Sequence, residues 1–416
     1  MTTLHVGFRK LCFAAAAGLL VTGIAACGSG ATSGGGNDTI KIGSLHPLTG
    51  DTAIEGQGMD IAVKMAVDDI NASGGIKSLG GRKLEVISAD TKGDPSVGQT
   101  AAQRMLDQGV TGLIGAYNTS VTTNVVSVAQ RAQLPLVIDV AAGTAVIPPN
   151  TTYAFRLQPT GAAMGVDGAN FIKAIAEKNG HPVAKVAVLH EKSNFGTDVT
   201  NSFKQQAQKL GIEVGLVIPY DAATVTNLTT ELTQVKAYHP DVLVVSGYYN
   251  DGVLIAQNAA AVQPDVQAIF GVVEAAYDQP QFPHDAPNVS NGIYDVNYHY
   301  NATSQDSKAL RDRFLKANGK AMRTTAVYSY ESTLVLADAL ERASSTDPKK
   351  LRTALAQTEL KQDVLAFSGP IKFGPDGEDV NAKATLMQVQ GQEVPQVFPE
   401  AVAEKAPIWP AVPWKK

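Results

Sequence analysis

The feature that most restricts the fold of this chain is a regular alternation of strand-like and helix-like segments from residue 39 onward. Short apolar segments typical of buried strands are separated by longer segments whose apolar residues recur at helical spacing. In the first third, the expected strands are 40–45, 83–89, 111–115 and 136–140, and the expected helices are 61–70, 97–106 and 119–132. Such alternation is typical of parallel strands joined by crossover helices, and it predicts an α/β fold.

The same pattern begins again near residue 171. The expected helices are 171–177, 203–210, 228–237 and 253–261, and the expected strands are 186–190, 212–219, 242–247 and 267–271. A third stretch, 306–356, is mostly helical, and strand character returns only in 371–373 and 384–389. The sequence therefore predicts two successive open α/β units. Open parallel sheets bind ligands beyond the carboxyl ends of their strands, and two facing units would form a cleft for a small molecule.

A secretory signal is predicted at the amino terminus, over residues 1–26. Two basic residues, Arg9 and Lys10, precede an apolar run, 11–24, that is shorter than the roughly 20 residues needed to cross a bilayer. The run ends in Ile24-Ala25-Ala26-Cys27, which resembles the bacterial lipobox, where an aliphatic residue and two small residues precede the cysteine that receives the lipid. The alternative is an ordinary signal peptide followed by a chance cysteine.

Cysteine usage agrees with a lipoprotein. Of the two cysteines in the chain, Cys12 would be removed with the signal, and Cys27 would become the first residue of the mature chain. No internal disulfide is then expected, and lipidation of Cys27 explains the lone thiol. Residues 27–38 are rich in glycine and small polar residues and predict a flexible tether. We therefore expect an exported protein that is lipid-anchored on the outer face of the cytoplasmic membrane.

Composition and motifs exclude several classes of function. The net charge of −5 and the hydrophobic content of 44% leave no basic surplus for nucleic acid. No Gly-x-Ser-x-Gly elbow or His-Glu-x-x-His pair occurs, and the mature chain keeps no free cysteine nucleophile. We expect a monomeric binding protein without cofactor or metal rather than an enzyme, with a hydrolase as the alternative. Asp139, which ends a buried strand, either contacts a ligand or forms local hydrogen bonds.

Short blocks along the whole body resemble the branched-chain amino-acid-binding proteins of ABC importers. The blocks are, in order, Ile40-Lys41-Ile42-Gly43, Pro47-Leu48-Thr49-Gly50, 68–76, Asp94-Pro95, 115–120, 135–141, 190–196, Ser246-Gly247-Tyr248 and 271–274. Because many blocks agree in order and spacing, the chain is identified as a member of this family. The resemblance implies the type I periplasmic-binding-protein fold, in which two α/β lobes close around a ligand by a hinge motion. It also implies ABC permease and ATPase subunits as partners.

The resemblance further implies where the lobes begin and end. The three crossovers between the lobes are expected near 157–160, 295–300 and 367–373. Lobe one would then consist of residues 39–158 plus 296–366, and lobe two of residues 159–295 plus 367–416.

Two loops of lobe one are implied to hold a ligand carboxylate: Asn118, Thr119 and Ser120 in the first loop, and Ala141, Gly143 and Thr144 in the second. Free backbone N–H groups at the start of a helix attract an anion, although Ser, Thr and Asn are also ordinary helix caps. Relatives often carry a hydroxyl at the position of Gly143, which Thr144 would here replace.

Three residues of lobe two are implied to complete the site. Glu274 matches the acid that binds an α-ammonium group, and Tyr248 matches a tyrosine that lines the pocket. Phe195 stands where relatives often have tyrosine, which makes the wall more apolar. Glu55 also departs from the family, because it replaces a tyrosine near the ligand side chain; we expect it to point to solvent.

These residues favour a small zwitterion, most simply a branched-chain or other hydrophobic amino acid, as the ligand. A short amide, a urea-like solute or an aromatic carboxylate is the alternative, suggested by Phe195, Gly143 and Glu55. A ligand-sensing role rather than transport also stays open, because the fold alone does not separate the two.

Overall fold

The computed structural model describes residues 39–414, so the predicted signal peptide and the tether with Cys27 lie outside the described residues. The first large sheet has five parallel strands in the order β2-β1-β3-β4-β5. Their bounds are β1 (Ile40–His46), β2 (Leu84–Asp90), β3 (Leu113–Gly115), β4 (Leu136–Ile138) and β5 (Ala154–Arg156). The associated helices are α1 (Ala53–Ala72), α2 (Pro95–Asp107), α3 (Thr119–Ala132), α9 (Gln305–Asn318), α10 (Thr324–Ala343) and α11 (Pro348–Ala356).

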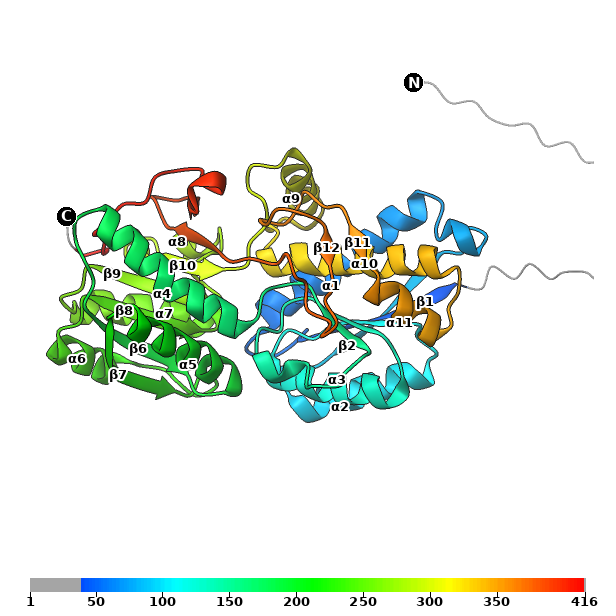
Figure 1. Ribbon diagram of the computed structural model, residues 1–416, viewed down its shortest axis with the longest axis horizontal. Coiled ribbons are helices and arrows are strands. Elements are labelled where there is room, and N and C mark those ends of the chain that lie inside the picture. Colours follow the sequence, from blue (N-terminus) through cyan, green and yellow to red (C-terminus); the bar gives the residue numbers. More distant parts are fainter. Residues whose placement is uncertain (1–38, 415–416) are drawn as a thin grey trace, which may run out of the picture. The chain divides into compact units, whose positions relative to one another are not determined.

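Helices cover both faces of this first sheet (Figure 1). Ile40 and Ile42 pack with α1 and α10, whereas Leu45 packs with α2 and α3, because side chains along a strand point alternately to opposite faces. Local sequence starts the helices: the Asp94 side chain accepts hydrogen bonds from the N–H groups of Ser96 and Val97 and so caps α2.

The second large sheet has seven strands in the order β14-β13-β10-β9-β8-β6-β7. Their bounds are β6 (Lys185–Glu191), β7 (Glu213–Tyr220), β8 (Val242–Gly247), β9 (Ala268–Glu274), β10 (Tyr294–Asn297), β13 (Thr385–Gln388) and β14 (Gln396–Phe398). The strands from β10 to β7 pair in parallel, and β13 and β14 add antiparallel strands at one edge. The helices here are α4 (Gly161–Lys178), α5 (Asn194–Lys209), α6 (Thr229–Tyr238), α7 (Tyr249–Val262) and α8 (Phe282–Asp285).

The second sheet is also covered on both faces. One face packs with α4 and α5 through Val186, Val188 and Phe270, and the other packs with α6 and α7 through Leu243 and Val245. Strands buried on both faces read as nearly continuous apolar runs, which explains why they were visible in the sequence. The predicted α/β fold, with parallel strands flanked by helices, is confirmed.

The remaining short elements lie between or after these strands: β11 (Glu359–Leu360), β12 (Ile371–Lys372), and the 3₁₀ turns η1 (Lys77–Leu79), η2 (Thr144–Val146) and η3 (Glu400–Val402). Strand pairing moves one of the expected lobe boundaries. Residues of β10 still pair with β9, and residues 377–379 lie beside β5, where the N–H of Arg156 donates to the Gly377 carbonyl at 2.8 Å. The third passage between the sheets thus falls a few residues later than the resemblance implies, whereas β10 ends at Asn297, within the range expected for the second passage. The division into lobes stays a prediction.

Candidate functional site

A small cavity lies where the carboxyl ends of strands from both sheets meet. Its lining comes from the ends of β3, β4, β6, β8, β9 and β10: Tyr117, Thr119, Val140, Ala142, Phe195, Gly247, Tyr248, Val273, Ala275, Asn297 and Tyr298. Binding at this edge is the general behaviour of open parallel sheets. The cavity volume is about 30 Å³, room for roughly one or two water molecules. A ligand of amino-acid size therefore needs the adjoining space or a rotation of the two sheets apart.

Aromatic rings form much of the cavity wall. The ring of Tyr248 lies 5.6 Å from that of Phe195 and 6.1 Å from that of Tyr117, measured between centroids. Burial raises the pKa of Tyr248 above its ordinary value, so its hydroxyl stays neutral. The lining contains no carboxylate and no basic side chain, and Asn297 and Thr119 are its polar groups apart from the tyrosines. The wall suits an uncharged, flat or branched apolar group.

Local hydrogen bonds fix two of these rings at the starts of helices. The Ser193 hydroxyl accepts from the N–H of Phe195 at 3.2 Å, and the Glu191 carboxylate accepts from the N–H of Gly196 at 2.6 Å. Tyr248 is the N-cap of α7, and its N–H donates to the Asp251 carboxylate at 3.1 Å. The rings are therefore held by capping residues that the short strand-to-helix loops bring together.

Two lining residues have strained backbones. Tyr117 has a φ of 72° and Val273 a φ of 58°, in the left-handed region that β-branched residues in particular avoid. Such strain persists where the surrounding structure imposes it, and it is concentrated at ligand sites.

The loop from Val140 to Gly143 contributes Val140 and Ala142 to the cavity lining. The carbonyl oxygen of Ala142 accepts from the N–H of Gly161, and the N–H of Gly143 donates to the Thr119 hydroxyl at 3.1 Å. Within residues 39–414, the N–H groups of Ala141 and Ala142 have no acceptor.

Next to this loop, α3 begins at Thr119, and its N-cap Asn118 makes no capping hydrogen bond with its side chain. Free N–H groups converging at a helix start form a site for an anion such as a carboxylate.

A larger, polar recess of about 580 Å³ adjoins the cavity and shares Tyr248 with it. Asn118 and Ser120 line this recess rather than the cavity, together with charged residues from both sheets, including Asp51, Lys92, Glu191, Lys192, Asp221 and Asp251. Of the predicted ligand-binding residues, the structure therefore brings Thr119, Phe195 and Tyr248 into the cavity and Asn118 and Ser120 into the recess beside it.

Four other predicted residues lie outside the lining. Ala141 and Gly143 are buried and flank the lining residue Ala142 in the chain. Thr144 instead joins the two sheets: its N–H and its hydroxyl both donate to the Asp198 carboxylate in α5, at 2.8 and 2.7 Å. The fourth residue, Glu274, lies between the lining residues Val273 and Ala275, but its side chain does not reach the cavity.

The Glu274 carboxylate occupies a buried acidic environment. It is fully buried, and neither oxygen accepts a hydrogen bond of good geometry within the described residues. It lies close against α7, because a Cβ placed on Gly252 would come within 2.2 Å of one of its oxygens. Burial raises the pKa of Glu274 well above its ordinary value, and the nearby carboxylates of Asp251 and Asp295 raise the pKa further.

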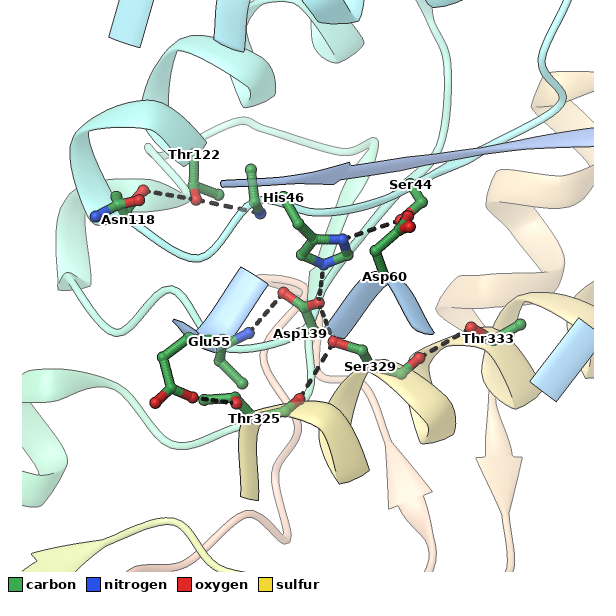
Figure 2. Close-up of polar contacts among 12 residues, drawn as sticks. Ser44, His46, Glu55, Asp60, Asn118, Thr122, Asp139, Thr325, Ser329 and Thr333 are labelled. Carbon is green, nitrogen blue, oxygen red and sulfur yellow. Dashed lines mark hydrogen bonds and ion pairs between the residues drawn. The ribbon is translucent and has the colours of Figure 1, made fainter. Parts of the chain in front are cut away.

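Asp139 forms local hydrogen bonds and does not line the cavity (Figure 2). Its carboxylate accepts from the Ser329 hydroxyl at 2.7 Å and from the N–H of Val140 at 2.9 Å, and one oxygen lies 2.8 Å from His46 Nε2. His46 Nδ1 in turn lies 2.9 Å from the Ser44 hydroxyl. This serine, histidine and aspartate resemble a hydrolase triad in geometry only, because all three side chains are completely buried.

The expectation that Glu55 points to solvent is wrong. Only 1% of its surface is exposed, and its carboxylate binds Arg323 Nη1 and the Thr325 hydroxyl, each at 2.6 Å. The Arg323 guanidinium also lies 4.2 Å from the ring centroid of Tyr249 in α7. Periodicity along α1 could not reveal this pair, because Arg323 is far away in the sequence.

Several lining residues were absent from the sequence prediction: Tyr117, Val140, Ala142, Gly247, Val273, Ala275, Asn297 and Tyr298. Most of them adjoin predicted residues at strand ends, so extending each candidate loop by one residue would have included them. Asn297 and Tyr298 fall in the second expected crossover, a position that signalled proximity to the cleft.

No helix among the described residues is both long enough and apolar enough to cross a membrane. In the same part of the chain, no cluster of three or more His, Cys, Asp or Glu residues has a geometry that could hold a metal ion.

Comparison with known proteins agrees with the fold. A family model described as periplasmic binding protein matches residues 39–393. The Leu/Ile/Val-binding protein homolog 8 of Brucella abortus is 26% identical over 375 residues, which cover 88% of this chain and 91% of the relative.

Solved structures share the fold at lower identity. The branched-chain amino acid transporter substrate binding protein LivJ from Streptococcus pneumoniae, in complex with isoleucine, is 24% identical with a TM-score of 0.75, over 86% of this chain and 98% of that protein. A solute-binding protein of an ABC transporter from R. palustris, in complex with benzoate, is 18% identical with a TM-score of 0.73, over 88% of this chain and 99% of that protein.

These relatives are binding proteins, which confirms the expectation that the chain is not an enzyme. The family match spans nearly all of the two sheets, their crossover helices and the cavity between the strand ends. On that match, the chain belongs to the periplasmic binding protein family.

Proposed function

We propose that this chain is the extracytoplasmic solute-binding component of an ABC importer, and that it binds a small carboxylate with an apolar body. The observation that carries the proposal is the cavity itself, which combines an uncharged aromatic wall with a neighbouring loop in which the N–H groups of Ala141 and Ala142 have no acceptor among the described residues. An acid placed there would direct its carboxylate at the N–H groups of Ala141, Ala142 and the start of α3, and its body at Phe195 and Tyr248.

A hydrophobic amino acid, such as leucine, isoleucine or valine, is the first candidate. Relatives named for these amino acids support it. Glu274 is one residue away from the lining on either side, and both of its oxygens lack a good hydrogen bond in the described residues. A rotation of this side chain would supply the acceptor that an α-ammonium group requires.

An aromatic acid is the second candidate, and the lining favours it specifically. Four aromatic side chains and no carboxylate face the cavity, so the wall would accept a benzoate-like ring without a partner for an ammonium group. A relative of the same fold was solved with benzoate.

Binding would couple to rotation of one sheet against the other. Thr144 donates to Asp198 in α5, and the Asn250 side chain donates to the carbonyl of Asp51 at 3.2 Å, so two contacts already join the sheets near the cavity. A ligand that touches both sheets stabilises the closed arrangement only if it binds that arrangement more tightly than the open one. The importer would recognise the closed form, and a sensing role would use the same motion.

A thermal-shift screen of residues 39–416 tests the proposal. The compounds to be added, each at high concentration, are leucine, isoleucine, valine, benzoate, a short amide and urea. A compound that binds only the folded state contributes about 2.7 kcal/mol of stability at about a hundredfold excess over its Kd. A rise in Tm with the three amino acids supports the first candidate, and a rise with benzoate alone supports the second. A shift with amides or urea but no acid would contradict the carboxylate proposal.

The role of Glu274 predicts a pH dependence for amino acids alone. The carboxyl group must be ionised to accept an ammonium group, and its pKa in the free protein is held well above the ordinary value. Affinity for leucine should therefore rise as the pH increases through that raised pKa, with release of a proton on binding. Calorimetry in buffers of different ionisation enthalpy measures this release. Glu274→Gln should weaken leucine binding about tenfold or more and abolish the release, because a neutral amide replaces a charge-assisted bond.

Benzoate binding is the control for this experiment, since it should depend little on pH and on Glu274→Gln. Unchanged leucine affinity in the Glu274→Gln variant would remove Glu274 from the ligand site.

Lipid anchoring is a separate part of the proposal. Cys27→Ser removes the sulfur that would carry the lipid. The variant should therefore be released from the membrane, whereas the chain with Cys27 should be retained there through its lipid. Fractionation of cells with detection of the chain measures this difference, and Cys12→Ser is the matched control, because Cys12 would be removed with the signal. Retention of the Cys27→Ser variant in the membrane would contradict the lipobox interpretation.

A further inference from the structure

Arg156, at the end of β5, is fully buried. Its guanidinium lies against the loop of residues 140–143, called here the ligand loop. Its Nη1 donates to the carbonyl oxygens of Ala141 and Gly143, at 2.9 and 2.7 Å. Its Nε and Nη2 donate to the two carboxylate oxygens of Glu378, at 2.8 and 2.5 Å. A planar guanidinium can make both sets of bonds, because the edge formed by Nε and Nη2 matches a carboxylate while Nη1 points to the loop carbonyls.

These bonds set the direction of two N–H groups. A peptide unit is planar, and its carbonyl and N–H point in opposite directions. Holding the Ala141 carbonyl toward Arg156 therefore turns the N–H of Ala142 to the opposite side, where Ala142 lines the cavity. Holding the Gly143 carbonyl does the same for the N–H of Thr144, which donates to Asp198 in α5.

Glu378 holds the guanidinium in place from the other side. The segment that carries it is bound to the backbone of Arg156, because the Arg156 N–H donates to the Gly377 carbonyl at 2.8 Å and the Asp379 N–H donates to the Arg156 carbonyl at 3.0 Å. Gly377 has a φ of 80°, and a Cβ there would lie 2.3 Å from the Ala154 carbonyl oxygen, so this close approach requires glycine. The Arg156–Glu378 pair is therefore part of the backbone framework rather than a mobile surface contact.

We propose that Arg156 is a positioning residue for the ligand carboxylate, acting through the carbonyls of Ala141 and Gly143. The inference rests on the proposed function, since it assumes that an anion occupies the N–H groups of this loop. Arg156 itself does not touch the ligand. It fixes the peptide planes that present the N–H of Ala142 to the ligand and the N–H of Thr144 to the opposite sheet.

The test compares acids with the corresponding alcohols, which lack the carboxylate, in the Arg156→Lys variant. Lysine keeps the charge but has a single nitrogen that cannot hold both carbonyls and Glu378 in the same geometry. We expect affinity for leucine or benzoate, whichever the unmodified protein binds, to fall about tenfold or more, while leucinol or benzyl alcohol loses much less. Arg352→Lys is the matched control, because Arg352 donates to a carbonyl outside the ligand loop, that of Thr152.

Two further measurements keep the inference separate from the proposed function. Glu378→Gln retains Arg156 and should lower the affinity for the acid more than that for the alcohol, by a smaller factor than Arg156→Lys. This variant replaces Arg156→Lys in the test if Arg156→Lys does not fold. Amide hydrogen exchange without ligand should become faster at residue 144, whose N–H donates to Asp198, in Arg156→Lys but not in Arg352→Lys.

Equal losses for acid and alcohol, or unchanged exchange at residue 144, would overturn the positioning role. Failure of the unmodified protein to bind any acid would instead overturn the proposed function, and the exchange experiment would still decide the role of Arg156.

Discussion

Replacing Glu55 with alanine should lower the free energy of unfolding by about 3–5 kcal/mol, because it leaves the Arg323 guanidinium buried without its partner. Glu55 and Arg323 are 1% and 8% exposed, and their side chains meet at 2.6 Å. The Thr325 hydroxyl also loses its acceptor. Denaturant unfolding of residues 39–416, followed by circular dichroism, measures the change.

Two other substitutions show which part of this loss comes from the ion pair. Asp312→Ala breaks the pair between Lys308 and Asp312, whose side chains are each 61% exposed, and should cost less than about 0.5 kcal/mol. Glu55→Gln should cost less than Glu55→Ala, since burial already raises the pKa of Glu55 and opposes its charged form. If Glu55→Ala lowers the free energy of unfolding by less than about 1 kcal/mol, contact with solvent or with the Tyr249 ring replaces Glu55 as the partner of Arg323.

Replacing Tyr248 with alanine should weaken ligand binding by about thirtyfold or more, which corresponds to roughly 2 kcal/mol or more. Tyr248 contacts both Tyr117 and Phe195 in the wall and also borders the polar recess. Its removal would open the cavity to water where the ligand body packs. Calorimetric titration with the acid found in the screen measures the loss.

Tyr248→Phe separates the ring from its hydroxyl and should retain most of the affinity. Tyr238→Ala, at the end of α6 and away from the cavity lining, is the control for loss of a tyrosine elsewhere in the same sheet region. If Tyr248→Ala binds the acid as tightly as the unmodified protein, the ligand does not occupy this cavity.

The order of strands and helices could be predicted because it depends on local apolar periodicity. Because open parallel sheets bind ligands at the carboxyl ends of their strands, the predicted fold indicated the loops after β3, β4, β6 and β8 as candidate ligand sites. Three of the predicted residues, Thr119, Phe195 and Tyr248, lie at the start of a helix. Capping residues indicate such a position in the sequence. These signals involve only neighbouring residues.

The direction of side chains at the end of β9 could not be predicted in the same way. Alternation along a strand sets which residues face a ligand, but the positive φ of Val273 and an irregular register between β8 and β9 interrupt it. Glu274 therefore faces α7 rather than the cavity. Nothing in the sequence marks a valine that adopts a conformation which valine ordinarily avoids.

Long-range pairing was equally hidden. Arg156 and Glu378 are separated by 222 positions, and Glu55 and Arg323 by 268. Their partners are set by how the sheets and helices pack, so the local sequence carries no sign of them. Glu55 was consequently expected in solvent, when it forms one half of a buried pair.

Asn297 and Tyr298 occupy a position that the cavity shares with the passage between the two sheets. Both residues line the cavity, and they also belong to the stretch of chain that leaves β10 toward the helices of the first sheet. A substitution there would alter ligand fit and the freedom of the sheets to rotate at the same time. Phe195 and Val140 line the cavity from one sheet only, so changes there alter fit alone. Directed evolution toward a new solute should therefore accumulate changes at Phe195 and Val140 first, and leave Asn297 and Tyr298 untouched until compensating mutations have appeared elsewhere.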